Sequence, residues 1–143
     1  MSTTVANLVI HAEKTVFPDG VRPATIVIKG ERIVAVEPFG ASVNADEEFT
    51  VPQGQVLMPG LLDSHVHVNE PGRTQWEGYE SATRAALAGG ITTILDMPLN
   101  SDPPTVDVDK LELKRTATAG KLSVDVGLWG GAALPYTHPA LPT

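Results

Sequence analysis

Residues 56–68 read VLMPGLLDSHVHV and combine a turn, an apolar run and two histidines. Pro59-Gly60 predicts the turn, and the apolar run after it is typical of a strand inside a sheet. Side chains alternate between the two faces of a strand, so Asp63, His65 and His67 are expected on the same face. Two imidazoles about 7 Å apart along one strand can converge on a single cation near the strand's C-terminal end. Taken without its surroundings, however, a His-x-His pattern more often marks two structural histidines.

The segment after this strand predicts a helix over residues 74–88. Thr74 and Glu77 have the spacing of a capping box, in which each side chain satisfies a free backbone donor. Gly89-Gly90 predicts the left-handed stop. One face of this helix is expected to pack inside the protein at helical spacing, and it carries Trp76, Tyr79, Thr83 and Ala86.

Two further strands and one helix are predicted beyond this point. Residues 91–96 are β-branched and mostly apolar, which favours a strand covered on both faces. A second helix is expected to begin at Asp107 or Asp109 and to end at Gly120, followed by a strand over residues 122–128. Strands that alternate with helices predict a parallel sheet with right-handed crossovers.

The N-terminal part, residues 5–57, predicts a small β module without a helical period. Two apolar runs, residues 24–28 and 33–36, flank a loop in which Gly30 comes first, which is typical of a tight hairpin. Residues 39–48 are interpreted as a polar connector. We therefore expect two domains, residues 1–57 and 58–143.

Composition excludes several classes of function. The 143 residues carry 10 basic and 17 acidic side chains, a net charge of −7, so binding to nucleic acid or to an anionic membrane is not expected. The absence of cysteine excludes disulfides, thiolate metal sites and a thiol nucleophile. No apolar run approaches the roughly 20 residues that span a bilayer. A cytoplasmic protein is the expectation.

The region from Met58 to Thr105 resembles the cyclic amidohydrolases, and among them the allantoinases. The segments that carry the resemblance are HVHVNEPGRT at residues 65–74, WEGY at 76–79, AGGITT at 88–93 and DMPLNS at 96–101. The resemblance implies a (β/α)₈ barrel, of which this chain holds the first three strands, preceded by part of a small β-sandwich. It also implies a homo-oligomer and a small cyclic ureide as substrate, namely allantoin opened to allantoate in purine catabolism.

The same resemblance implies a binuclear metal site, usually zinc, whose bridging hydroxide attacks the cyclic amide. His65 and His67 match the two ligands of the first strand, and Asp63 matches the acidic residue that supports them. Asn69 and Asn100 match positions that contact substrate. A carboxamide at Asn69 suits a neutral ureide, whereas a dihydroorotase more often carries arginine there to pair with a carboxylate.

A complete barrel takes about 250 residues, and residues 58–143 are far fewer. The bridging carbamylated lysine, two more histidines and the catalytic aspartate of the family come from later strands, so no catalytic residue is expected in this chain. We expect an N-terminal segment that is inactive alone. Two alternatives remain open: another cyclic amidohydrolase (a dihydropyrimidinase or dihydroorotase), or a non-catalytic scaffold with the same fold.

The remaining polar residues are expected to be structural. His11 and His138 have no partner at ligand spacing. Asp125 is expected either to face the site or to be buried with a hydrogen bond. The lysines of the second helix and of its C-terminal end are interpreted as solvated charges; they are Lys110, Lys114 and Lys121.

Overall fold

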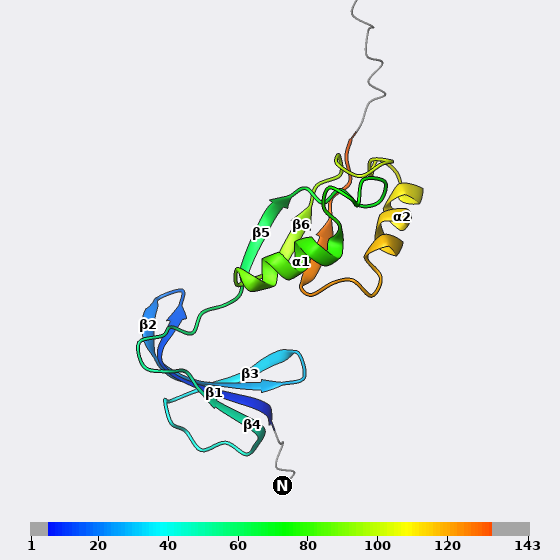
Figure 1. Cartoon of the computed structure of the whole chain (residues 1–143). Helices are drawn as coiled ribbons and strands as arrows, with labels where there is room; N and C mark the ends of the chain where they lie inside the picture. The colour runs from blue at the N-terminus through cyan, green and yellow to red at the C-terminus, as the bar shows by residue number, and fades with distance from the viewer. Residues whose placement is uncertain (1–5, 133–143) are drawn as a thin grey trace, which may run out of the picture. The chain divides into compact units, whose positions relative to one another are not determined.

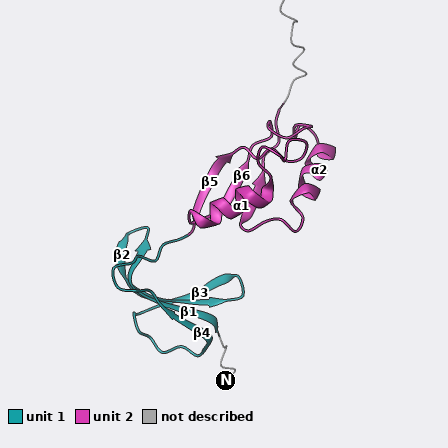
Figure 2. Ribbon diagram, in the orientation of Figure 1, with its two compact units in different colours: residues 1–59 teal, residues 60–143 magenta. Residues whose placement is uncertain are grey.

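The computed structural model describes residues 6–132. The chain divides into two compact units, residues 1–59 and 60–143, which Figure 2 shows in separate colours. Each unit has its own sheet and its own core.

The first unit is a four-stranded sheet with the strand order β3-β2-β1-β4 (Figure 1). Strands β1, β2 and β3 are antiparallel neighbours, and Gly30, at φ +58°, begins the two-residue turn between β2 and β3. This confirms the predicted hairpin, because a glycine at positive φ fits the twist of such a turn. The strands are β1 (Ala6–Phe17), β2 (Gly20–Lys29), β3 (Arg32–Glu37) and β4 (Ala45–Thr50).

The interpretation of residues 39–48 as a connector is wrong in its second half. Residues from Ala45 onward form β4, which pairs in parallel with β1 from Ala6↔Ala45 to His11↔Thr50. This edge strand is exposed along most of its length, so it has no alternating apolar pattern. Its acidic side chains are typical of an edge protected from further pairing.

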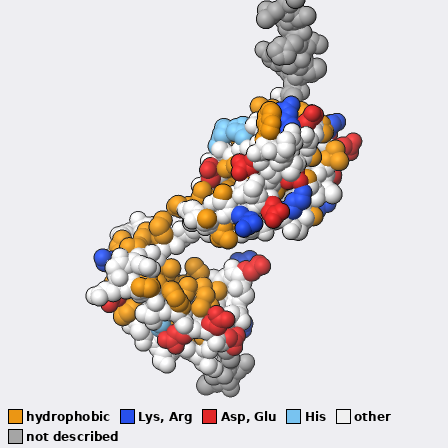
Figure 3. Space-filling view, viewed as in Figure 1, with side chains coloured by type: hydrophobic (Ala, Val, Ile, Leu, Met, Phe, Trp, Pro, Cys, Tyr) orange, Lys and Arg blue, Asp and Glu red, His pale blue; other side chains and the backbone are white. Residues whose placement is uncertain are grey.

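The core of the first unit is small. Ala6, Val9 and Val27 are buried in it, while Ile33 and Val36 on β3 are more than half exposed. Figure 3 shows apolar side chains gathered on the surface of this unit.

The second unit confirms the predicted alternation of strands and helices. Its three strands pair in parallel in the order β5-β6-β7, with α1 and α2 in the two connections (Figure 1). Asp107 caps α2, because its side chain accepts a hydrogen bond from the Lys110 backbone N–H. The elements are β5 (Leu61–Val66), α1 (Tyr79–Ala88), β6 (Ile91–Asp96), α2 (Val108–Thr118) and β7 (Asp125–Leu128).

Two predicted boundaries in this unit are wrong. Helix α1 begins at Tyr79, after Gly78, and no side-chain cap from Thr74 is present. Trp76 therefore lies outside the helix and is 69% exposed, whereas Tyr79 is buried as expected. The last strand begins at Asp125, because residues 122–124 form no ladder with β6.

The core of the second unit lies where α1 covers the sheet. Val68, Tyr79, Ala86 and Ile94 are its buried members. Within residues 6–132, no helix is long and apolar enough to cross a membrane.

Candidate functional site

Two histidine rings meet at the C-terminal end of β5. His65 lies in the strand and His67 directly follows it. Their Nε2 atoms are 3.1 Å apart, the ring centroids are 5.0 Å apart, and the ring planes form an angle of 60°. Both side chains are exposed, and Figure 3 shows histidine gathered at one place on the surface of the second unit. The structure thus brings the predicted pair together on an accessible face.

Asp63 acts on the backbone near this pair. The pairing of β5 with β6 is irregular between Asp63 and Val66. Within that irregularity, Asp63 Oδ1 accepts a hydrogen bond from the His65 backbone N–H over 3.1 Å. The carboxylate therefore holds the main chain at the first histidine, rather than either imidazole ring.

The spacing of the two Nε2 atoms fits a shared metal ion. Two nitrogen ligands about 2.0–2.1 Å from a tetrahedral zinc ion lie about 3.3 Å from each other, close to the spacing seen here. Among residues 6–132, no group of three or more His, Asp and Glu side chains is placed to hold a metal ion. The described residues thus fit two positions of a coordination shell.

Asp96, at the C-terminal end of β6, is the centre of a buried polar cluster next to the histidines. Its Oδ1 accepts from the Val68 backbone N–H over 2.8 Å. Its Oδ2 accepts from the Tyr79 hydroxyl over 2.6 Å and pairs with Lys114 Nζ at 2.8 Å. Burial, together with the carboxylate beside it, raises the pKa of Tyr79, so its hydroxyl remains a donor.

The interpretation of Lys114 as a solvated charge is wrong. Its side chain is 0% exposed, and the buried charge is compensated by Asp96 and by the Met97 carbonyl, which accepts a hydrogen bond from Nζ at 2.9 Å. Lys110, one turn earlier, is partly exposed and pairs with Asp107. Sequence reasoning missed this cluster, and its one visible signal was an acid at the end of an apolar strand, where α/β proteins place their sites.

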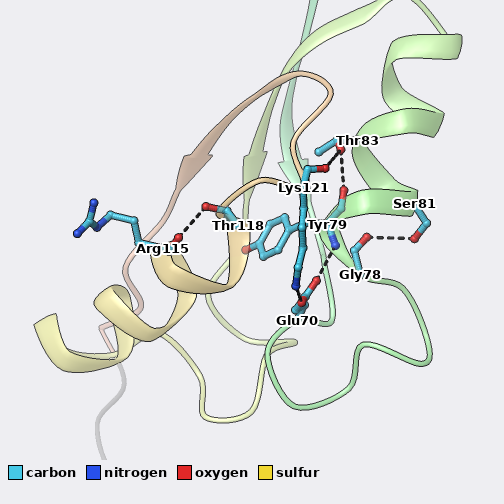
Figure 4. A network of polar contacts seen from close by, with 8 residues as sticks. All are labelled: Glu70, Gly78, Tyr79, Ser81, Thr83, Arg115, Thr118 and Lys121. Atoms are coloured by element: carbon cyan, nitrogen blue, oxygen red, sulfur yellow. Dashed lines mark hydrogen bonds and ion pairs between the residues drawn. The ribbon is translucent and has the colours of Figure 1, made fainter.

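A second network holds the start of α1 (Figure 4). Glu70, from the loop after β5, accepts a hydrogen bond from the Tyr79 backbone N–H over 2.9 Å and pairs with Lys121. Glu70 is buried, whereas the side chain of its partner Lys121 is 40% exposed, so Lys121 is in part a solvated charge and in part a structural partner. A carboxylate at a helix N-terminus satisfies a free amide and interacts favourably with the helix dipole. Glu70 thereby satisfies a free backbone N–H at the start of the helix, which was the role predicted for Thr74.

The predicted substrate contacts, Asn69 and Asn100, come together from two loops. The Asn100 side-chain amide donates to Asn69 Oδ1 over 3.4 Å, and both residues are half-buried. The next loop residue, Ser101, is buried, and its hydroxyl has no hydrogen-bond partner among the described residues.

The other polar residues lie away from the histidine pair or outside the described residues. His11 is buried in the first unit, with Nδ1 2.7 Å from Thr25 Oγ1 and Nε2 2.9 Å from Glu48, which makes it structural. His138 lies outside the described residues. Asp125 is exposed at the start of β7, so it is neither buried nor at the C-terminal end of that strand.

Comparison with known sequences identifies similar proteins. A sequence model described as the amidohydrolase family matches residues 56–138. The allantoinase of Streptomyces avermitilis is 52% identical over 125 residues, which are 87% of this chain and 28% of that protein. The allantoinase of Saccharomyces cerevisiae is 44% identical over 129 residues, 84% of this chain and 28% of that protein. The chain thus spans just over a quarter of the length of these curated relatives.

Comparison with solved structures gives a similar result. The L-hydantoinase (dihydropyrimidinase) of Arthrobacter aurescens matches 92% of this chain and 29% of its own chain, with a TM-score of 0.82 and 28% identity.

Proposed function

We propose that this chain, which belongs to the amidohydrolase family, forms part of a site that hydrolyses cyclic amides, with allantoin as substrate. The observation that carries the proposal is the distance of 3.1 Å between the exposed Nε2 atoms of His65 and His67. Amidohydrolases generally use divalent metal ions. His65 and His67 would hold such an ion, and zinc fits their nitrogen donors and their spacing.

The second unit would form the first three β/α units of a (β/α)₈ barrel. The parallel order β5-β6-β7 with a helix in each connection supports this proposal. In such barrels the site lies at the C-terminal ends of the strands, which is where the histidine pair and Asp96 lie. The first unit would be part of a small β-sandwich.

A bound divalent ion supplies a water whose pKa is lowered toward ~7 and a Lewis acid for the amide carbonyl. The chain's own part would be to present two imidazoles and to orient the substrate. Asp63 fixes the main chain at His65. Asn69 and Asn100 would contact the ring amides, because a carboxamide both donates and accepts hydrogen bonds.

Hydantoin is the second candidate substrate. The high TM-score with the Arthrobacter enzyme, whose name includes hydantoinase, favours it, while the higher sequence identity to allantoinases favours allantoin. Adding each compound to the ¹⁵N-labelled chain and following the side-chain amides of Asn69 and Asn100 compares the two. We expect larger shifts with allantoin, and larger shifts with hydantoin would reverse the order.

Zinc binding tests the proposed site directly. Competition with a chromophoric chelator should show weak binding to the purified 143-residue chain, because two imidazoles provide only part of a coordination shell. His65→Ala and His67→Ala should each abolish this binding, and His11→Ala, in the first unit, should leave it unchanged. Equal zinc affinity in all three variants would exclude the pair as the binding site.

The same zinc-loaded chain should turn over allantoin negligibly, since among residues 6–132 no group of three or more ligating side chains is placed to complete a metal site. Measured formation of allantoate by the purified chain would contradict this expectation.

A further inference from the structure

The hydrogen bonding between β5 and β6 changes character at the histidine pair. Val66 faces Asp96 in the parallel register, and the Met97 backbone N–H donates to the Val66 carbonyl over 2.7 Å. In a regular parallel ladder the next bond would run from the Val68 N–H to the Met97 carbonyl.

Two side chains replace that missing bond. The Val68 N–H donates instead to Asp96 Oδ1, and the Met97 carbonyl accepts from Lys114 Nζ. Asp96 and Lys114 then pair with each other through Asp96 Oδ2. The ladder therefore ends in a closed set of bonds that leaves neither backbone group unsatisfied, as burial requires.

His67 lies between the two main-chain points that this arrangement holds. On one side the Val66 carbonyl accepts from Met97, and on the other the Val68 N–H donates to Asp96. Val68 makes no main-chain hydrogen bond to β6, so the Asp96 carboxylate fixes the direction of the backbone just after His67. Tyr79 holds the opposite oxygen of the same carboxylate.

We infer that Asp96 is a positioning residue for the histidine pair: it aims the ring of His67 at His65 by holding the Val68 amide, with Lys114 and Tyr79 holding the carboxylate in place. The inference rests on the proposed function for its purpose, since a metal ion is what the aligned rings would share. Its geometry can be tested without any metal.

The first measurement uses the unmodified 143-residue chain without metal. A scalar coupling across the hydrogen bond, between Val68 ¹⁵N and the side-chain ¹³Cγ of Asp96, should be detectable, and the Val68 amide should exchange slowly although it lies outside any strand. Cross-ring nuclear Overhauser effects should connect His65 and His67. Fast exchange at Val68 with no coupling would overturn the inference.

The second measurement separates the hydrogen-bond acceptor of Asp96 from its buried charge. Both variants carry Lys114→Met, so that no unpaired lysine is left in the core. To this change, Asp96→Asn is added to keep an oxygen that can accept from the Val68 N–H, and Asp96→Leu is added to remove that oxygen at similar side-chain size. The Asn variant should retain the cross-ring effects and Val68 protection, and the Leu variant should lose both. Retention of both in the Leu variant would overturn the inference, and the wild-type coupling decides the question if that variant does not fold.

Zinc affinity provides a further readout. Loss of a group that orients a ligand typically costs 10–100-fold in metal affinity, so the Leu variant should bind zinc about 10–100-fold more weakly than its Asn counterpart. Equal affinity would count against a role for Asp96 in aiming the rings. If the wild-type chain binds no zinc, the proposed function fails, while the metal-free measurements still decide the role of Asp96.

Discussion

Replacing Lys114 tests whether the buried cluster stabilises the second unit. In Lys114→Ala, the Asp96 carboxylate loses its counter-ion at 2.8 Å and the Met97 carbonyl loses its donor at 2.9 Å. Both charged side chains are 0% exposed, so water cannot compensate. Removing one partner of such a pair costs about 3–5 kcal/mol, a large part of the 5–15 kcal/mol that stabilises a typical domain.

Urea unfolding followed by tryptophan fluorescence measures this loss of stability in the second unit alone. The two tryptophans, Trp76 and Trp129, both belong to the second unit. With a slope of about 2 kcal/mol per M, a loss of about 4 kcal/mol moves the midpoint down by about 2 M. Lys110→Ala is the matched control, because Lys110 lies on the same helix with its charge at the surface. Equal midpoints for the two variants would mean that Lys114 is solvated, and the reasoning would be refuted.

Two further predictions concern the loops beside the site. Glu70→Gln should destabilise the second unit by about 2 kcal/mol, since hydrogen bonds to charged groups contribute about 1.5–3 kcal/mol. The same urea titration measures this loss of stability, and Glu80→Gln, at an exposed residue of α1, is the control. An equal loss in both variants would argue against a specific role for Glu70. Gly72→Ala should lower the thermal midpoint more than Gly90→Ala. Both glycines have positive φ, but a Cβ at Gly72 would overlap the backbone of Asp102, whereas a Cβ at Gly90 would meet no atom. Equal thermal midpoints by circular dichroism would show that the loop around Gly72 accommodates the methyl group without loss of stability.

The fold of the second unit was predictable because its signals are local. The apolar periods of residues 61–66 and 91–96 and the cap at Asp107 each act within one element. Strand β4 was missed because an edge strand with few buried side chains carries no apolar alternation. Its pairing with β1 depends on a partner distant in sequence, which a local pattern does not contain.

The histidine pair was predictable for the same local reason, since residues two apart in an extended segment share a face, and His67 directly follows the strand that holds His65. The surroundings of the pair were not. Lys114 resembles any other lysine on an exposed helix, and only the packing of α2 against the end of β6 buries it. The start of α1 was placed too early because Thr74 and Glu77 fit a local cap, whereas Glu70 supplies the carboxylate from a preceding loop.

The buried bond between Asp96 and Lys114 also restricts how this sequence can change over time. Loss of either charge alone strands the other one away from water, while loss of both together removes that penalty. We therefore expect Asp96 and Lys114 to be substituted together in evolution, although they belong to different elements. A substitution that removes one charge is tolerated only when the other charge is also removed.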